Sequence, residues 1–368
     1  MRFVISAPNS TNGLTFTQYW SKMEPMKFPG GYYKYSNIQN FPGSAKMSGT
    51  LITLYPGGLR ELHWHTEIEW AIVLNGTCRA TVVEAGVGYS ETWDYGIGDV
   101  WYFRSNEGHM VQGLADGCTY LAGYTSGEFD DLTAPGVSSS LSLIPAEAAG
   151  QALGVSAAAV SASIAPNTNT FMPLGPVPNT TLEEFSRSLA GGSPALPVLQ
   201  THRIQLNNLA RKVDTAGGWF KIADSTNFPI STGFTGALVY FAPGGMRQYH
   251  WHTTVNEWQF VINGTLEAGV NIGPGKYEQS YLGAGDAGYA PVQSTHYLRA
   301  VGNAGAWVVL QFDGSPLTTI QLPDFLSQVP KQIVATSLNT SLAFTDLINY
   351  KSIGMVPPVN SSTSKAAT

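Results

Sequence analysis

The chain has 368 residues, a hydrophobic content of 43% and a net charge of −6, and it is long enough for two domains with cores of their own. Charged residues make up only 12% of it, against about 25% in an average domain, and the absence of a basic cluster argues against nucleic acid as a partner. No run of about 20 apolar residues occurs, so the sequence predicts no membrane-spanning helix.

Short strands separated by turns dominate the first half of the chain. Residues 1–45 carry mixed turn signals without a clear period, and we treat them as an N-terminal extension. Residues 46–125 are typical of consecutive strands with Gly and Asn-Gly turns between them, which indicates an antiparallel sandwich or barrel. The Ala-rich residues 137–163 are compatible with helix. The first domain is therefore expected to span residues 46–164.

A second series of strands follows a connecting segment. Residues 165–200 are rich in Pro, Asn and Thr and are predicted to join the two domains. Strand patterns then run from about residue 218 to 313, and a helical pattern over 322–339 mirrors the one after the first domain. We therefore expect a second domain over 201–345 and a C-terminal tail over 346–368.

Six of the seven histidines belong to two copies of one pattern. The first copy contains His63, His65, Glu69 and His109, and the second contains His250, His252, Glu257 and His296. Each histidine of the second copy lies 187 residues after its counterpart, and the glutamate lies 188 residues after. A repeat of this length indicates two homologous domains rather than a solenoid.

The repeated residues are typical of a metal site. On a strand, His63 and His65 point to the same face, and Glu69 and His109 are expected to join them from later strands. Imidazole and carboxylate ligands without a thiolate suit Mn, Fe, Co, Ni or Zn, and octahedral coordination favours Mn(II) or Fe(II). Four protein ligands leave two positions for substrate and for water or dioxygen. The sequence therefore predicts one metal site in each domain.

An arginine precedes each histidine cluster by three positions, at Arg60 and Arg247. An ideal strand would place Arg60 on the face opposite His63, so strand twist or a bulge must bring it to the metal. Beside a metal, a guanidinium binds and polarises a carboxylate. The alternative for each arginine is a structural ion pair with a local acid.

Other residues allow weaker inferences. Cys78 and Cys118 both lie in predicted strands, and the sequence leaves a disulfide and two buried free thiols equally open. We interpret Trp64 and Trp251 as core residues, and His202, which has no counterpart in the repeat, receives no role.

The Asn-X-Ser/Thr tripeptides bear on localisation. They stand at Asn9, Asn75, Asn179, Asn263, Asn339 and Asn360. Together with only 19 Lys and Arg residues, they favour a secreted, glycosylated protein. No signal peptide is recognisable at the N-terminus.

The motifs resemble those of the cupin superfamily. The run Gly57-x5-His63-x-His65-x3-Glu69-x6-Gly76 is similar to the first cupin motif, and the run from Gly244 to Gly264 repeats it. Gly285-x5-Pro291, leading to His296, is similar to the second motif. In the first domain that second motif is degraded, with Arg104 and Asn106 in place of the usual Pro and Gly. The resemblance implies an all-β fold of two tandem jelly-roll barrels, a bicupin, with short helical appendages.

Within the cupins, the chain resembles the two-domain oxalate decarboxylases over about residues 45–340, in segments such as GDVWYF and KIADSTNF. This resemblance implies two Mn(II) sites per chain and oxalate as the substrate, cleaved to formate and carbon dioxide. It implies dioxygen as a co-catalyst that is needed but not consumed. It also implies a homo-oligomer, either a trimer or a hexamer.

The same resemblance implies a flexible lid after the first cupin, which carries a proton-donating glutamate in the family. Asp131 takes the place of that glutamate here, and Glu128 is a nearby carboxylate in a different register. A solvated loop is the alternative for Asp130 and Asp131. The second domain has Leu317 and Thr318 at this offset and no acid, so we predict that the first site carries out the chemistry.

Three other functions remain open from the sequence. Oxalate oxidase on the same scaffold would produce hydrogen peroxide, and the altered lid keeps it in consideration. Another metal-dependent cupin, such as a ring-cleaving dioxygenase, fits less well, because two arginine-bearing sites suit a small diacid better than a flat aromatic. A non-enzymatic storage or binding bicupin would usually lack complete ligand sets, and both are complete here.

Overall fold

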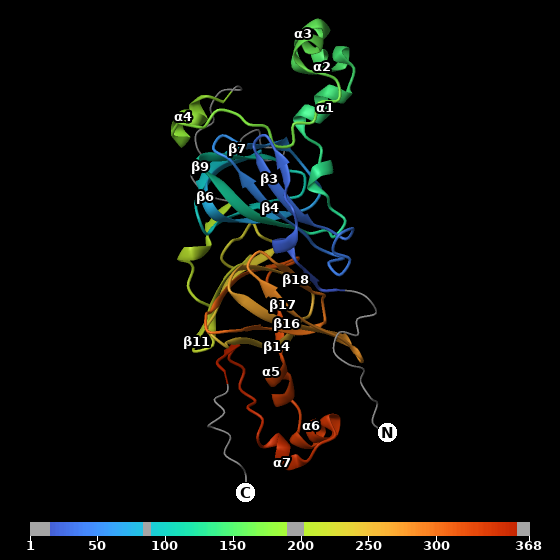
Figure 1. Cartoon of the computed structure of the whole chain (residues 1–368), viewed down its shortest axis with the longest axis vertical. Coiled ribbons are helices and arrows are strands. Elements are labelled where there is room, and N and C mark those ends of the chain that lie inside the picture. The colour runs from blue at the N-terminus through green and yellow to red at the C-terminus, as the bar shows by residue number, and fades with distance from the viewer. Residues whose placement is uncertain (1–14, 84–89, 190–201, 359–368) are drawn as a thin grey trace. The chain divides into compact units, whose positions relative to one another are not determined.

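The structure is a computed structural model that describes residues 15–83, 90–189 and 202–358. The chain divides into two compact units. The first unit contains the described residues of 24–37 and 48–207, and the second contains those of 15–23, 38–47 and 208–358. Each unit is a predominantly β structure with a few appended helices (Figure 1), which confirms the predicted all-β bicupin class.

The described part of the first unit forms one strongly curved antiparallel sheet. Its path is β10-β8-β6-β9-β4-β3-β2, with β5 paired to β9 and β7 paired to β6. The strands are β2 (Met26–Phe28), β3 (Gly31–Ser36), β4 (Ser48–Leu54), β5 (Leu59–His63), β6 (Glu69–Val83), β7 (Ser90–Tyr95), β8 (Asp99–Phe103), β9 (Gly108–Tyr124) and β10 (Arg203–Gln205). The helices are α1 (Val137–Leu143), α2 (Ala146–Leu153), α3 (Ala157–Ser163) and α4 (Leu182–Arg187), and a 3-10 turn covers Asp131–Thr133.

The second unit has two antiparallel sheets in its described residues. One has the order β1-β18-β15-β20-β13-β12-β11, and the other has the order β17-β16-β19-β14-β21, with β22 also paired to β14. The strands are β1 (Thr17–Gln18), β11 (Val213–Thr215), β12 (Gly218–Ala223), β13 (Thr235–Phe241), β14 (Met246–His252), β15 (Glu257–Asn263), β16 (Thr265–Gly273), β17 (Lys276–Gly283), β18 (Ala287–Ala290), β19 (Thr295–Ala300), β20 (Ala306–Phe312), β21 (Thr319–Gln321) and β22 (Met355–Val356). The helices are α5 (Leu322–Ser327), α6 (Lys331–Leu338) and α7 (Leu342–Thr345), and short 3-10 turns cover Trp20–Lys22 and Leu206–Asn208.

Strand pairing divides the chain differently from the five linear segments expected from the sequence. Strand β3, expected within the N-terminal extension, pairs with β4 of the first barrel. Strand β1 pairs with β18, and β10 pairs with β8. Short segments from the predicted N-terminal extension and from the start of the predicted second domain therefore complete sheets in both units, because an antiparallel edge accepts any extended segment that reaches it.

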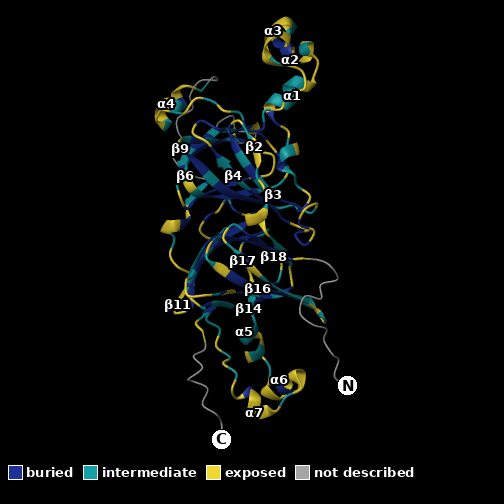
Figure 2. Ribbon diagram, in the orientation of Figure 1, coloured by how far each residue is buried: buried dark blue, intermediate teal, exposed yellow. Residues whose placement is uncertain are grey.

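A cluster of buried apolar side chains forms the core of each barrel, and the appended helices are largely exposed or half-buried (Figure 2). Large buried side chains include Trp70, Trp101 and Trp258. Cys78 and Cys118 form a disulfide between β6 and β9, with a Cα–Cα distance of 5.5 Å. This resolves the alternative left open by the sequence. No helix in the described residues has the length and apolarity needed to cross a membrane.

Candidate metal centres and the lid

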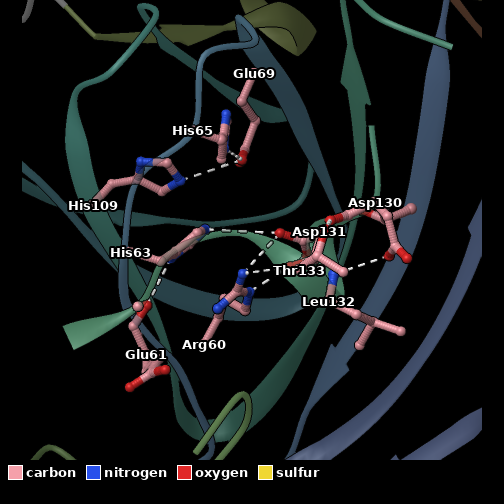
Figure 3. A network of polar contacts seen from close by, with 12 residues as sticks. Arg60, Glu61, His63, His65, Glu69, His109, Asp130, Asp131, Leu132 and Thr133 are labelled. Carbon is pink, nitrogen blue, oxygen red and sulfur yellow. Dashed lines mark hydrogen bonds and ion pairs between the residues drawn. The ribbon is translucent and has the colours of Figure 1, made fainter. Parts of the chain in front are cut away.

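The first barrel brings together all four predicted metal-binding residues. His63 ends β5, Glu69 begins β6, and His109 lies in β9 directly opposite His63. With His65, which follows β5, each offers one ligand atom within 4.8 Å of the others, and all four side chains are buried. Figure 3 shows the four converging on one point.

Backbone carbonyls fix the orientation of these imidazoles. The Nδ1 atoms of His63, His65 and His109 lie 2.7, 3.0 and 2.8 Å from the carbonyl oxygens of Glu61, Glu67 and Glu107. A carbonyl accepts only, so each Nδ1 donates a proton and each Nε2 carries a lone pair. This is the arrangement that metal-binding histidines use, since the outer hydrogen bond aims Nε2 at the metal.

The inner atoms of this set fit a cation. The Nε2 atoms of His65 and His109 each lie 3.4 Å from Glu69 Oε2 and have no hydrogen-bond partner. Two lone pairs facing a carboxylate are unfavourable unless a positive charge lies between them. Burial lowers the pKa of His63 well below its usual range, and the charge of Arg60 lowers it further. The imidazole is therefore neutral, as a metal ligand must be.

Glu69 is held ionised in the same site. Burial alone would raise the pKa of Glu69, and positive charge at His109 and His65 lowers it below the usual range. With neutral rings, a bound cation would supply that charge. Its other oxygen, Oε1, accepts a hydrogen bond of 2.7 Å from the Trp101 indole. The carboxylate is thus fixed on one side and free to bind a cation on the other.

Arg60 reaches the metal site through a β-bulge, as the sequence requires. The register of β5 against β9 shifts between the Arg60–Val111 and His63–His109 pairs, so two residues on β5 oppose one on β9. Arg60 is 2% exposed, and the Phe171 ring lies 4.1 Å from its Cζ. The bulge places a buried guanidinium on the same side of the strand as His63.

The lid segment places one of the two candidate acids at the metal site. Asp131 is buried, its Oδ1 lies 2.8 Å from Arg60 Nη2, and the same oxygen lies 3.9 Å from His63 Nε2. Asp130 caps the 3-10 turn by accepting a hydrogen bond from the Leu132 amide. Figure 3 shows Asp131 facing both Arg60 and His63. Glu128 is exposed and lines a surface cavity of about 410 Å³ together with Trp64 and His65.

The second unit repeats the ligand set with small differences. His250, His252, Glu257 and His296 also lie with their ligand atoms within 4.8 Å of one another. The Nδ1 atoms of His250 and His296 donate to the carbonyls of Gln248 and Ser294, whereas that of His252 lies 3.0 Å from the Thr319 hydroxyl. Gln259 donates to Glu257 Oε1, as Trp101 does to Glu69. Both units therefore contain a metal-binding His/Glu site.

Arg247 differs from Arg60 in its partners. The β14–β19 register also shifts between Arg247 and His250, so the bulge is repeated. Arg247 Nη1, however, donates to the Gln321 side chain and to the Gly354 carbonyl, at 3.0 and 3.1 Å. Burial lowers the pKa of Arg247 to about 10, which still leaves it charged at neutral pH. An uncharged amide thus stands where Asp131 faces Arg60.

One buried charged network and the position of one tryptophan differ from what the sequence indicates. His202 is fully buried and lies 2.7 Å from Glu91 Oε2 and 3.3 Å from Glu107 Oε2. Glu107 accepts hydrogen bonds from the backbone and side chain of Arg104. The expectation of a core position was wrong for Trp64, which is 36% exposed, because its strand face points to the lid. Trp251 is half-buried, with its ring centroid 5.7 Å from that of Phe325.

The His202 network lies directly behind the first metal set. Glu107 links the two groups. Its backbone carbonyl accepts the hydrogen bond from His109 Nδ1, and its carboxylate faces His202. Arg104 and Asn106 of this turn depart from the usual second cupin motif, and Asn106 adopts a left-handed φ of 64°. Asn tolerates this conformation better than most residues with a Cβ. The degraded motif therefore keeps its turn and still presents His109 to the metal site.

Comparisons with known proteins agree with this architecture. The family model described as Cupin matches residues 22–161 and 204–346. Oxalate decarboxylase OxdC of Bacillus subtilis (strain 168) is 30% identical over 320 residues, which are 87% of this chain and 81% of that protein. A probable oxalate decarboxylase of Arthroderma benhamiae is 29% identical over 340 residues, which are 91% of this chain and 82% of the relative.

Solved structures of the Bacillus subtilis oxalate decarboxylase superpose with a TM-score of 0.83 at 28% identity, covering 94% of this chain and 89% of that one. One of them belongs to a study that assigns the EPR parameters of the Mn(II) centres in that enzyme. The family match covers both barrels, and each barrel holds a complete ligand set. The chain belongs to the cupin family, as a bicupin related to the oxalate decarboxylases.

Proposed function

We propose that this protein is a manganese-dependent oxalate decarboxylase that works in its first barrel. The observation that carries the proposal is the buried pair of Arg60 and Asp131 beside the first metal set. A cation that binds a carboxylate and an acid that moves a proton are the two groups that the reaction needs. The similarity to the decarboxylases of Bacillus subtilis and Arthroderma benhamiae supports the same substrate.

The reaction divides hydrogen oxalate into formate and carbon dioxide without net oxidation. The bond between the two carbons breaks, one carbon leaves as carbon dioxide, and the proton of the substrate moves to the remaining carbon. Mn(II), bound by His63, His65, Glu69 and His109, would supply Lewis-acid and one-electron chemistry. Dioxygen would act as a co-catalyst that is not consumed, as in the resemblance above.

Arg60 and Asp131 have separate parts in this scheme. A substrate carboxylate competes with Asp131 for the Arg60 guanidinium, which then orients and polarises it. Asp131, released from the ion pair and still within the buried site, accepts the substrate proton at a carboxylate oxygen and returns it to the carbon. Burial of both side chains excludes the water that would otherwise compete for these hydrogen bonds.

Oxalate oxidase is the second candidate function, and one observation favours it. Asp131 is one methylene shorter than the glutamate that the lid carries in the family, so its carboxylate reaches less far toward the substrate. Without protonation of the carbon, the one-carbon fragment that remains after the first carbon dioxide leaves would be oxidised to a second carbon dioxide, and dioxygen would be reduced to hydrogen peroxide. The contact between Asp131 Oδ1 and Arg60 is our reason for ranking the decarboxylase first.

A matched pair of substitutions tests which barrel works. Glu69→Gln and Glu257→Gln make the same change in the two ligand sets, and each should lower the bound manganese by one ion per chain. The proposal expects Glu69→Gln to lose formate production and Glu257→Gln to retain measurable formate production. Loss of formate with Glu257→Gln alone would assign the chemistry to the second barrel.

We also propose that the protein is secreted and glycosylated. Four of the six sequons lie in the described residues, at Asn75, Asn179, Asn263 and Asn339, and all four are exposed; Asn9 and Asn360 lie outside them. The disulfide is typical of an oxidising compartment. Glycan release followed by mass spectrometry of protein from its native host tests this, and unmodified peptides at all six positions would contradict it.

The appended helices support a homo-oligomer, which we propose to be a trimer or hexamer. Leu143 and Leu153 of the first unit are 67% and 52% exposed, and Phe325 and Ile333 of the second are 51% and 53% exposed. Apolar side chains gathered on protruding helices are typical of an interaction surface. Light scattering after size-exclusion chromatography gives the mass directly, and a monomer at micromolar concentration would contradict the proposal.

A further inference from the structure

The second metal set opens onto a cavity of about 350 Å³ within the second unit. Its lining combines Arg247 and residues of the ligand set with apolar walls that include Phe220, Val239 and Leu310. The exposed residue of the lining is Lys212, which therefore marks the mouth. At roughly 30 Å³ per water molecule, this space is far larger than a metal ion and a two-carbon acid require.

Among the described residues, no carboxylate lies within ion-pair distance of the guanidinium in this cavity. In the part of the chain that the structure describes, Arg247 hydrogen-bonds to Gln321 and to the Gly354 carbonyl and forms no ion pair with a carboxylate. Arg60 in the first barrel is neutralised by Asp131 at 2.8 Å. The acid that acts on Arg247 electrostatically is Glu257 of the ligand set, whose charge a bound metal would share. A half-buried guanidinium in this position favours an anionic ligand, because the ligand supplies a direct charge partner.

Smaller and less polar side chains create the space. The Glu61 amide donates to the Phe171 carbonyl and the Gln248 amide donates to the Gly354 carbonyl, so Gly354 stands where Phe171 covers Arg60. Strand register gives a second replacement, because Tyr124 lies opposite Glu69 whereas Phe312 lies opposite Glu257. The second cavity thus lacks the close ring that lies 4.1 Å from Arg60 Cζ, and the Phe220 ring lies farther from Arg247 Cζ, at 5.6 Å. It also lacks the hydroxyl of Tyr124.

Two further replacements on neighbouring strands also make the second cavity larger and less polar. Tyr35 pairs with Thr50 in the first unit, and the matching pair in the second unit is Ile222 with Ala237. Both hydroxyl-bearing residues have become aliphatic, and the Ala237 side chain is the smaller of its pair. The walls away from Arg247 therefore offer apolar contact and few hydrogen-bond donors.

We propose that this cavity binds a monocarboxylate with a compact apolar body, such as an aromatic or branched aliphatic acid. The carboxylate lies between Arg247 and the metal position, and the body lies against Phe220, Val239 and Leu310. A dicarboxylate such as oxalate is the poorer ligand, because its second carboxylate would lose water against apolar walls without gaining a donor. A volume of about 350 Å³ lies within the range of pockets that enclose small molecules.

Calorimetric titration of the manganese-loaded full chain with benzoate tests the proposal. We expect one benzoate per chain, and binding of acetate weaker by at least about tenfold, since acetate lacks the apolar body. Arg247→Gln should weaken benzoate binding by at least about tenfold, through loss of the charged donor. The matched variant Arg60→Gln should leave the benzoate affinity unchanged, because Arg60 belongs to the first barrel.

A second variant guards against misfolding as an explanation. Ala237→Leu fills the cavity without a change of charge and should also weaken benzoate binding, with manganese content measured for every variant. Unaltered affinity in both Arg247→Gln and Ala237→Leu would overturn the proposal, as would loss of binding in Arg60→Gln or no binding to the fully loaded wild type. The readout does not use oxalate turnover, so failure here is distinguishable from failure of the proposed decarboxylase.

Discussion

Replacing Asp131 by Asn separates the proton-carrying role of this residue from its packing role. Asp131 receives three hydrogen bonds from Arg60: Nη2 donates to Oδ1 at 2.8 Å and to the backbone carbonyl at 3.2 Å, and Nε donates to Oδ2 at 3.4 Å. Asn keeps the carbonyl contact and one side-chain acceptor but removes the negative charge and the exchangeable carboxyl proton. Asp131→Asn therefore preserves the shape of the lid while it removes its acid.

Two magnitudes follow for this variant. Breaking a buried ion pair outright costs about 3–5 kcal/mol, and Asn retains part of the bonding, so we expect a loss of at most about 3 kcal/mol in unfolding free energy. A general acid or base contributes roughly 10²–10⁴-fold to the rate, so formate production should fall by a factor in that range. Urea unfolding and quantification of formate by NMR measure the two effects on the same sample.

The control for this variant is Glu128→Gln. Glu128 is the other candidate acid from the sequence, and it is exposed, so its replacement should have little effect on formate production. Wild-type formate production in Asp131→Asn would refute the reasoning about Asp131. Loss of formate production in Glu128→Gln would show that Glu128, and not Asp131, carries the proton.

Three further predictions concern stability. Burial alone would lower the pKa of His202, but hydrogen bonds to Glu107 and Glu91 raise it to about 9. Protonated His202 thus contributes on the order of 3 kcal/mol to the free energy of unfolding, fully present below about pH 6.5 and lost as pH rises through about 9. Denaturant unfolding across this range should show the decline in stability, and an identical decline in His202→Gln would contradict the assignment. Reduction of the disulfide between Cys78 and Cys118, which are 40 residues apart, should cost about 4 kcal/mol by the loop-entropy model, and unchanged thermal stability after complete reduction would refute this. Removal of metal with a chelator should lower the melting temperature, and manganese at about 100 times its Kd should restore roughly 2.7 kcal/mol per site; an apo protein as stable as the loaded one would argue against folded-state metal binding.

The metal sites were predictable from the sequence because strand alternation and the repeat together mark their ligands. Strand alternation puts His63 and His65 on one face, and the repeat identifies Glu69 and His109 as their companions. The parity of Arg60 required a twist or bulge, and the shifted register provides the bulge. Each of these inferences needed only spacing along the chain and the period of a strand.

The His202 network and the paths of the strands were not predictable in this way. His202 meets Glu91 and Glu107 because β10 adds to β8 across about a hundred residues of sequence, and no periodic pattern marks that pairing. Strand β6 also runs unbroken from Glu69 to Val83 although Gly76 suggested a turn. Gly76 has a left-handed φ of 69°. This conformation accompanies register irregularities within β6 and does not end the strand.

The difference between the two cavities also lay beyond the sequence pattern. The ligand sets are nearly identical, and the contrasts between the repeats that the sequence offered, the absence of an acid near Leu317 and the degraded motif at Arg104 and Asn106, do not concern the cavity walls. That Gly354 replaces Phe171 over the arginine depends on where the chain returns to each barrel after its helices. The walls of a site made by non-local segments become visible only in three dimensions.

The most direct test of the account is the product ratio from oxalate in the manganese-loaded protein, with formate and hydrogen peroxide measured in the same reaction. The account predicts close to one formate per oxalate consumed and little peroxide, because Asp131 stands beside the first metal set to protonate the carbon. Peroxide without formate would contradict the assignment of Asp131 and make the protein an oxalate oxidase. Consumption of no oxalate by a fully loaded protein would contradict the proposed substrate itself.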